Sequence, residues 1–354
     1  MEYLPGGFVM ALRPRIRPFV CLLKILIVKP SSLGDVIQSL PVLRLLKRKH
    51  PDSEVHWWLA EGLFPLLDGD PDIDRLIPFN RDDWKSFRGL RRLTSTLRET
   101  RARQYDLVID LQGLARSGVL SWLTRGAVTV GIDLRSEGAR MFYDRAVARP
   151  AEPHAVDWYL NVARSLDLDL DAEFNWIPVR QLQRDEILRS HPLRGKRIIG
   201  VVPGARWTNK RWPVDHFQDA MDRMRAPKTA FAIIGGSEDR EFADSLTQRK
   251  DAVDLLGQTS LPQMIEWVRR CDLVITNDTG PMHVAAALSK PTVGLFGPTR
   301  PDQTGPYGQV RNCLRVELPC APCMKSSCNF DRKLACLTDI SPLAVSETAR
   351  RLLA

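Results

Sequence analysis

A run of apolar residues, a loop of small residues and a helix-forming segment follow one another between residues 273 and 288, and they constrain the fold strongly. Residues 273–275 are typical of the end of a buried strand, and residues 282–288 have the composition of a helix with Pro281 in its first turn. Proteins of the α/β class bind phosphate at such a junction, because free backbone N–H groups and the helix dipole point there. The segment therefore predicts an α/β fold that holds a phosphorylated ligand.

The same alternation of strand-like and helix-like segments recurs along the chain. In the first half we expect strands at Lys24–Val28, Glu54–Leu59, 105–110 and 128–131, and helices at 34–49, from 87, 114–123 and 154–166. In the second half we expect strands at Arg197–Val202, 230–234, 253–256, 272–275 and 292–296, and helices at 213–224, 238–248, Leu261–Arg270 and 282–288. Such alternation with short loops predicts parallel sheets covered on both faces, with right-handed crossovers, as in Rossmann-like domains. Residues 60–86 show no regular pattern.

The chain has 354 residues, a natural size for two domains. The acidic, irregular segment 167–180 suggests a linker. We expect an extension without stable structure and no signal peptide over 1–20, an N-terminal domain over 21–174 and a C-terminal domain over 175–340. A final helix over 341–354 is expected to pack back on the first domain. The ligand would then lie in the cleft between the domains, at the carboxyl ends of the strands.

The charge of the chain indicates anionic partners. The formal net charge is +9, and the densest group of cations lies between residues 81 and 103. Such a run is either a solvated helix face or, given the interleaved Trp84 and Phe87, an edge that meets an anionic and partly apolar surface. No recognition motif for nucleic acid accompanies it, so we expect no nucleic-acid partner. The longest apolar stretch near the N-terminus is interrupted by Lys24 and is too short to span a bilayer.

The segment Lys29–Asp35 is a second strand-to-helix loop. Glycine at position 34 lets a ligand approach the backbone, and Asp35 lies in the first helical turn, where the dipole favours its ionised form. The carboxylate of Asp35 either accepts a proton from a sugar hydroxyl or only caps the helix.

Two further loops in the second half have ligand-binding character. Lys210 and Arg211 follow the strand Arg197–Val202 and are placed to meet phosphate oxygens, unless the loop is simply a solvated basic turn. Glu238 follows two glycines and either binds ribose hydroxyls or marks an acidic helix start. Neither a P-loop nor a G-x-G-x-x-G pattern follows any strand, which argues against a P-loop nucleoside triphosphatase and against a dinucleotide dehydrogenase.

Four cysteines near the C-terminus, at positions 320, 323, 328 and 336, have the spacing C-x₂-C-x₄-C-x₇-C. One C-x₂-C is half of a zinc knuckle, but the other spacings are irregular, so Cys320, Cys323, Cys328 and Cys336 are either zinc ligands or free thiols.

Taken together, these loops resemble glycosyltransferase family 9, the ADP-heptose:lipopolysaccharide heptosyltransferases. The matching segments run in family order from the first strand to Thr299. They are KPSSLGD at 29–35, DLQGL at 110–114, Pro203-Gly204, KRWP at 210–213, NDTG at 277–280 with His283, and GPT at 297–299. Residues 131–143 and 154–156 are similar to the heptosyltransferase I branch, whereas the cysteine-rich tail looks more like the second and third heptosyltransferases.

The resemblance implies a GT-B fold, with the acceptor-binding domain first and the nucleotide-sugar domain second. It implies inverting transfer with Asp35 as general base and with no cofactor or catalytic metal. It places eight residues at the donor: Ser32, Gly34, Lys210, Glu238, Asp278, Thr279, Gly280 and His283. For the acceptor we expect Arg88, Arg91, Arg92 and Gln112.

The activity implied is transfer of L-glycero-D-manno-heptose from ADP-heptose to the lipopolysaccharide inner core, on Kdo-lipid A or a heptosyl acceptor. The expected partners are an ADP-activated sugar and an anionic glycolipid. The expected location is the cytoplasm, peripherally on the inner membrane. Three alternatives stay open: a GT-B-fold sugar-nucleotide epimerase, a family 9 transferase with a different sugar or acceptor, and a non-catalytic binding module.

Overall fold

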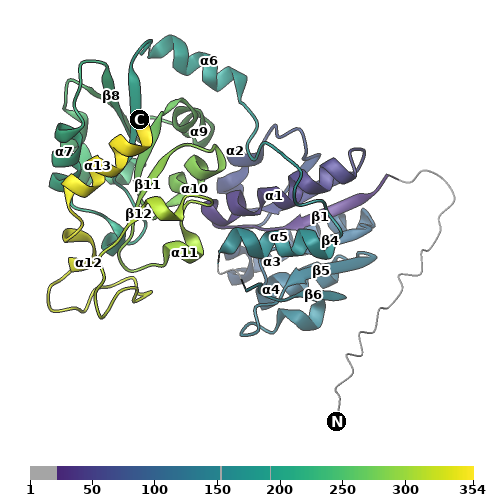
Figure 1. Cartoon of the computed structure of the whole chain (residues 1–354). Coiled ribbons are helices and arrows are strands. Elements are labelled where there is room, and N and C mark those ends of the chain that lie inside the picture. Colours follow the sequence, from purple (N-terminus) through teal and green to yellow (C-terminus); the bar gives the residue numbers. More distant parts are fainter. Residues whose placement is uncertain (1–21, 152–153, 192) are drawn as a thin grey trace.

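The computed structural model describes residues 22–151, 154–191 and 193–354, and it contains two six-stranded parallel sheets side by side (Figure 1). The expected extension over residues 1–20 lies outside the described residues. The prediction of two parallel α/β halves is confirmed.

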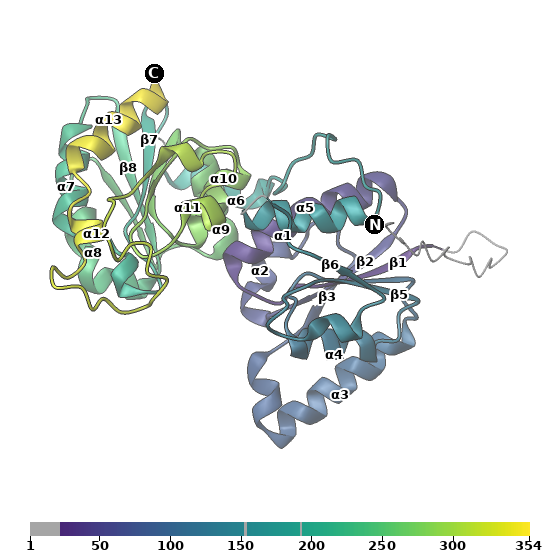
Figure 2. The same cartoon turned by 60° about the horizontal axis from the view of Figure 1, so that its bottom comes forward.

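The first sheet has the strand order β3-β2-β1-β4-β5-β6. Its strands are β1 (Lys24–Val28), β2 (Glu54–Leu59), β3 (Arg75–Pro78), β4 (Leu107–Asp110), β5 (Val128–Ile132) and β6 (Arg145–Val147). Helices α1 (Leu33–Lys49) and α5 (Ala155–Ser165) cover one face, and α3 (Phe87–Ala102) and α4 (Ala115–Leu123) cover the other (Figure 2). The short helix α2 (Phe64–Leu67) follows β2.

The second sheet has the order β12-β11-β10-β7-β8-β9. Its strands are β7 (Arg197–Val202), β8 (Thr229–Gly235), β9 (Ala252–Leu256), β10 (Leu273–Asn277), β11 (Thr292–Leu295) and β12 (Cys313–Leu314). Its helices are α6 (Gln181–Ser190), α7 (Val214–Arg223), α8 (Arg240–Thr247), α9 (Leu261–Arg270), α10 (Gly280–Ala287), α11 (Pro301–Thr304), α12 (Ala335–Thr338) and α13 (Pro342–Leu353). Numbered within each half, both sheets have the order 3-2-1-4-5-6, and ligands bind such sheets where the order reverses, beside strands one and four.

The central strands form because their residues are continuously apolar, as burial on both faces requires. Ile25 of β1 pairs with Val55 of β2 on one side and with Leu107 of β4 on the other. The side chains of Ile25 and Val55 are completely buried. The largest hydrophobic cluster continues from the first half into the second, and α1 packs directly on α10. The two halves therefore meet through the helices that follow β1 and β10.

The structure corrects several expectations. The segment 60–86, which shows no regular pattern, contains the edge strand β3. Only Ile77 of this strand is buried, so the strand lacks the apolar pattern by which strands are predicted. Helix α6 and the three-residue strand β6 were also not expected from the sequence.

The final helix does not pack back on the first domain. It contacts α7, β10 and β11, and Val345 and Ala349 are fully buried in the core of the second half. The apolar stripe of α13 thus covers the second sheet, beside α7.

Among the described residues, no helix has the length and hydrophobicity needed to cross a membrane.

Candidate active site

Asp35 lies in the first turn of α1, directly beyond the carboxyl end of β1. Its Oδ2 accepts hydrogen bonds from the backbone N–H of Ser32 at 2.8 Å and from the hydroxyl of Ser32 at 2.6 Å. Its Oδ1 has no hydrogen-bond partner among the described residues, and the side chain is only partly buried. One oxygen therefore orients the carboxylate, and the other is left to accept a proton.

Lys29 supplies a positive charge beside Asp35. Its side chain is buried, with Nζ 5.4 Å from the centre of the Tyr159 ring on α5. Burial alone would raise the pKa of Asp35, but the charge of Lys29 and the Ser32 hydrogen bonds lower it. Asp35 is therefore ionised at neutral pH and below.

Asp110, the last residue of β4, binds the backbone of the loop that follows this strand. Its Oδ1 accepts from the backbone N–H groups of Gln112 and Gly113, and its Oδ2 accepts from the Tyr143 hydroxyl at 2.8 Å. Burial raises the pKa of Asp110 despite these hydrogen bonds. The side-chain Oε1 of Gln112 is buried and has no hydrogen-bond partner within the described part of the chain, so its expected acceptor role stays a prediction.

His283 of α10 lies against α1, across the boundary between the two halves. Its Nδ1 is 3.3 Å from the side-chain nitrogen of Gln38 on α1. A Cβ at Gly34 would lie only 2.8 Å from Nε2 of His283, and one at Gly280 would lie 2.6 Å from Cδ2 of Leu33. The two glycines therefore permit this approach, which brings Gly34 next to His283 and Gly280 next to Leu33. The expected role of these residues and of Ser32 in donor binding stays a prediction.

Asp278, one residue beyond β10, connects the loop after this strand to neighbouring loops of the second half. Its Oδ2 is 2.6 Å from Nζ of Lys210 and accepts from the Thr299 hydroxyl at 2.6 Å. The ammonium of Lys210 also lies 4.7 Å from the centre of the Trp207 ring. The predicted pair of loops is thus joined by a partly buried ion pair, with Thr279 at the start of α10 beside it.

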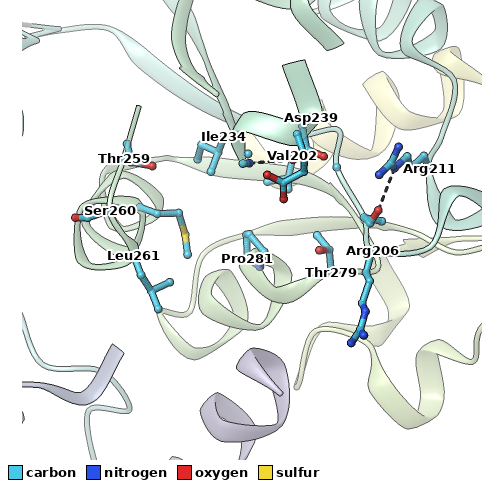
Figure 3. Close-up of a pocket in the computed structure, with 16 residues that line it drawn as sticks. Val202, Arg206, Arg211, Ile234, Asp239, Thr259, Ser260, Leu261, Thr279 and Pro281 are labelled. Carbon is cyan, nitrogen blue, oxygen red and sulfur yellow. Dashed lines mark hydrogen bonds between the residues drawn. The ribbon is translucent and has the colours of Figure 1, made fainter. Parts of the chain in front are cut away.

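A pocket of about 560 Å³ opens at the carboxyl edge of the second sheet (Figure 3). Val202 and Ile234 from the strands, with Leu261 from the start of α9, give it an apolar part. Thr279 and Pro281 bring the N-terminus of α10 to its other side. A pocket that combines an apolar part with a helix N-terminus has the features needed to hold a nucleoside diphosphate.

Two acidic residues in this pocket have different roles. Asp239 is buried, and its carboxylate accepts from the backbone N–H of Gly236 and occupies the space that a side chain at Gly204 would need. Glu238 is exposed at the pocket and has the freer carboxylate. The geometry therefore makes Asp239 part of the pocket's framework and leaves Glu238 available to a ligand.

The expected acceptor-binding arginines project from α3, and they are not equivalent. Arg92 is 2.6 Å from Oδ1 of the buried Asp83. Arg88 and Arg91 are exposed and make no ion pair within the described residues, and the neighbouring Phe87 is 84% exposed. The side chain of Trp84 lies outside what the structure describes, so its expected contribution stays a prediction.

The cysteines near the C-terminus are free thiols. Burial is the main cause that raises the pKa of Cys336, and the nearby thiols of Cys328, Cys320 and Cys323 raise it further. The four cysteines therefore lie near one another. Within the described residues, no three His, Cys, Asp or Glu side chains are arranged to hold a metal ion, so the structure gives the zinc interpretation no support.

Several residues of the site were not singled out from the sequence as site residues. Lys29 and Tyr143 lie in the segments 29–35 and 131–143 that carry the family resemblance, but neither was given a role of its own. Gln38 lies in none of those segments, and its contact with His283 joins distant parts of the chain. Of the further pocket residues, Arg206 lies in the predicted loop after Arg197–Val202 without a role of its own, and Thr259 and Ser260 were not predicted. Their position after strands β7 and β9 is the one signal that would have identified them.

Comparison with known proteins places this geometry in a family. The model of "Glycosyltransferase family 9 (heptosyltransferase)" matches residues 91–334. Lipopolysaccharide heptosyltransferase 1 of Pseudomonas aeruginosa is 34% identical over 341 residues, covering 91% of this chain and 93% of that protein. Lipooligosaccharide heptosyltransferase 2 of Haemophilus influenzae is 28% identical, covering 83% of this chain and 89% of that protein.

Solved structures show the same architecture. A glycosyl transferase family 9 protein from Veillonella parvula aligns with a TM-score of 0.78 at 28% identity, covering 94% of this chain and 97% of the other. Escherichia coli heptosyltransferase WaaC with ADP aligns with a TM-score of 0.73 at 24% identity, covering 93% of this chain and all of the other. The expected GT-B fold is confirmed. On the family model and the 34% identical relative together, this chain is a glycosyltransferase and belongs to family 9.

Proposed function

We propose that this protein transfers L-glycero-D-manno-heptose from ADP-heptose to the lipopolysaccharide inner core, with inversion at the anomeric carbon. The observation that carries the proposal is the meeting of α1 and α10. Through this contact the ionised carboxylate of Asp35, which has one oxygen without a hydrogen-bond partner in the described residues, lies opposite the loop that begins at Asp278. The relatives named as lipopolysaccharide heptosyltransferases support the choice of sugar and acceptor.

In the proposed reaction, Asp35 accepts the proton of an acceptor hydroxyl while that oxygen attacks the anomeric carbon. The bond from this carbon to the diphosphate breaks, and ADP leaves with the electron pair. Inversion needs one such carboxylate, because the attacking oxygen arrives on the face opposite the leaving group. Lys29 keeps Asp35 ionised, so that it is ready to accept the proton.

We place the donor in the pocket of the second domain. The apolar part suits the adenine, and Glu238 is available to the ribose hydroxyls. Lys210, with Thr279, Gly280 and His283 at the start of α10, lies where the diphosphate would sit. Positive charge and oriented N–H groups stabilise the departing ADP without a divalent metal.

We place the acceptor on the first domain, which we take to extend to residue 174, before the nucleotide-sugar domain begins at 175. The exposed Arg88 and Arg91, with Phe87, form a basic and partly apolar edge on α3. An anionic glycolipid in the cytoplasmic leaflet of the inner membrane fits such an edge, so we propose peripheral contact with that surface.

The proposal is tested by incubating the purified protein with ADP-heptose and Kdo-lipid A and determining the mass and anomeric configuration of the product by mass spectrometry and NMR. One added heptose with inverted configuration is expected. Conversion of the nucleotide sugar when no acceptor is present would instead indicate an epimerase. No reaction with heptose, together with turnover of another ADP-sugar, would overturn the choice of donor.

A further inference from the structure

Gln38 of α1 reaches into the second domain and contacts His283. The side chain of Gln38 is 4% exposed, and its amide nitrogen lies 3.3 Å from Nδ1 of His283. An amide nitrogen can only donate, so Nδ1 is the acceptor and carries no proton.

The ring of His283 is neutral in this setting. Burial lowers the pKa of His283, although the charges of Asp278 and Asp35 act in the opposite direction. His154 and Lys210 also lie near enough to act on the ring, and both favour the neutral form. A neutral ring has one proton, and since Nδ1 accepts from Gln38, that proton is on Nε2.

The Nε2 edge of the ring faces the place where the two helix N-termini meet. A Cβ at Gly34 would be 2.8 Å from Nε2, so this edge lies against the first turn of α1, beside Asp35. An N–H group between the start of α1 and the start of α10 is suited to donate to an oxygen atom of a ligand, and a phosphate oxygen is the best acceptor of this kind.

We propose that Gln38 is a positioning residue for the donor: it holds His283 in the Nε2–H tautomer, and that N–H donates to the diphosphate of the nucleotide sugar. The proposal rests on the proposed function for the identity of the ligand. Its consequence is that affinity for the nucleotide depends on a side chain of the acceptor domain. The donor site is complete only when the two domains are seated against each other.

The tautomer is tested directly by ¹⁵N NMR of the histidine rings in the full-length protein, with His283→Asn used to assign the signals. The expected wild-type pattern is a protonated Nε2 and an unprotonated Nδ1. In Gln38→Met the constraint is lost, and the ring should populate both tautomers. A wild-type ring protonated on Nδ1 would overturn the proposal whatever the enzyme's substrate is.

ADP binding, measured by calorimetry, tests the consequence. Gln38→Met should weaken ADP binding by about three- to tenfold, the effect of one misplaced hydrogen bond. Gln38→Glu accepts from Nδ1–H, so ADP should bind more weakly than to wild type at neutral and alkaline pH. Binding should recover as the pH falls, because the added carboxylate favours a second proton on the ring.

Ser39→Ala is the matched control, since it removes a buried polar group from the same helix. Its ADP affinity should stay within about twofold of wild type. If Gln38→Met behaves like Ser39→Ala, the positioning role is refuted. If ADP binding depends on Gln38 as expected but no heptose is transferred, the proposed function fails while the role of Gln38 stands.

Discussion

Both domains place a carboxylate at the end of their fourth strand, yet the two carboxylates have different partners. Asp110, the last residue of β4, is completely buried and bound by two backbone N–H groups and the Tyr143 hydroxyl. Asp278, just beyond β10, is bound by the ammonium of Lys210 and the Thr299 hydroxyl. The neutral donors around Asp110 fix the conformation of its loop, whereas Asp278 holds the ammonium of Lys210 in place at the proposed donor site.

The carboxylate that we propose as the base of the first domain lies in the neighbouring loop, after β1. Asp35 has one oxygen without a hydrogen-bond partner in the described residues, whereas Asp110 has both oxygens engaged. In each Rossmann-like sheet, charged side chains therefore gather at the loops that follow the central strands. The local hydrogen bonds then determine which carboxylate has an oxygen free to accept a proton.

The largest effect is expected at the proposed base. Asp35→Asn keeps the size of the side chain but removes the basic oxygen, so kcat should fall by roughly 10²-fold or more, with ADP affinity little changed. Steady-state kinetics with calorimetry measures both quantities. Asp110→Asn should instead lower the melting temperature and affect kcat less. Equal losses of kcat in the two variants would show that Asp35 and Asp110 do not differ in this way.

Removal of the cation next to Asp278 should weaken the donor site. Lys210→Ala is expected to reduce ADP binding by about 1.5–3 kcal/mol, the scale of a charge-assisted hydrogen bond. Isothermal titration calorimetry gives the value, and Lys228→Ala, at an exposed position of the same domain, is the control. An unchanged ADP affinity in Lys210→Ala would remove Lys210 from the donor site.

The pH profile should respond to Lys29. In the wild type the pKa of Asp35 is lowered, so the base stays ionised well into the acidic range. Lys29→Met removes a charge that opposes the effect of burial, which raises the pKa of Asp35 and shifts the acidic limb of kcat/KM to higher pH. Lys29→Arg keeps the charge and should keep the limb near its original position. A profile of Lys29→Met that overlays the wild type would show that Lys29 does not act on the base.

A smaller effect is expected on the face of α3. Replacing Arg88 and Arg91 with glutamine should raise KM for the acceptor and weaken salt-sensitive binding to anionic vesicles, by about 1 kcal/mol for each charge. Arg92→Gln removes a side chain already paired with Asp83, so it should change vesicle binding less. ADP affinity should be the same in all of these variants. Loss of ADP binding with an intact acceptor KM would place the acceptor on another face.

The smallest effect is expected from removal of metal ions. Lys210 and the start of α10 provide the positive character that a divalent cation would otherwise supply, so EDTA should leave the rate unchanged. Loss of transfer in EDTA, with recovery on addition of magnesium, would show that these groups are insufficient.

Much of the architecture could be predicted because the central strands are apolar without interruption. The predicted bounds of β1, β2 and β7 agree with the structure, as do those of α9. Edge strands such as β3 bury too little to leave a pattern. The final helix was assigned to the wrong domain, because an apolar stripe shows that a helix is covered but not which surface covers it.

The site was predictable to the level of loops and less so to the level of contacts. Glycine and acidic residues after strands identified the loops that hold Asp35 and Asp278. The sequence did not distinguish Glu238 from Asp239, because two adjacent carboxylates at a helix start look alike until burial is known. Gln38 has an unremarkable position within a helix, and its partner lies 245 residues away in the chain.

The close approach at Gly34 has a consequence for how this enzyme could be stabilised. Alanine within a helix is favoured over glycine by about 1 kcal/mol, so a scan based on local preference would choose Gly34→Ala as an improvement. In this protein the added methyl group would collide with the ring of His283 and push the two domains apart. The helix would gain rigidity while the attacking and leaving groups were forced apart. Glycine at this position costs helix stability but lets the two domains approach each other, as the proposed transfer between their substrates requires.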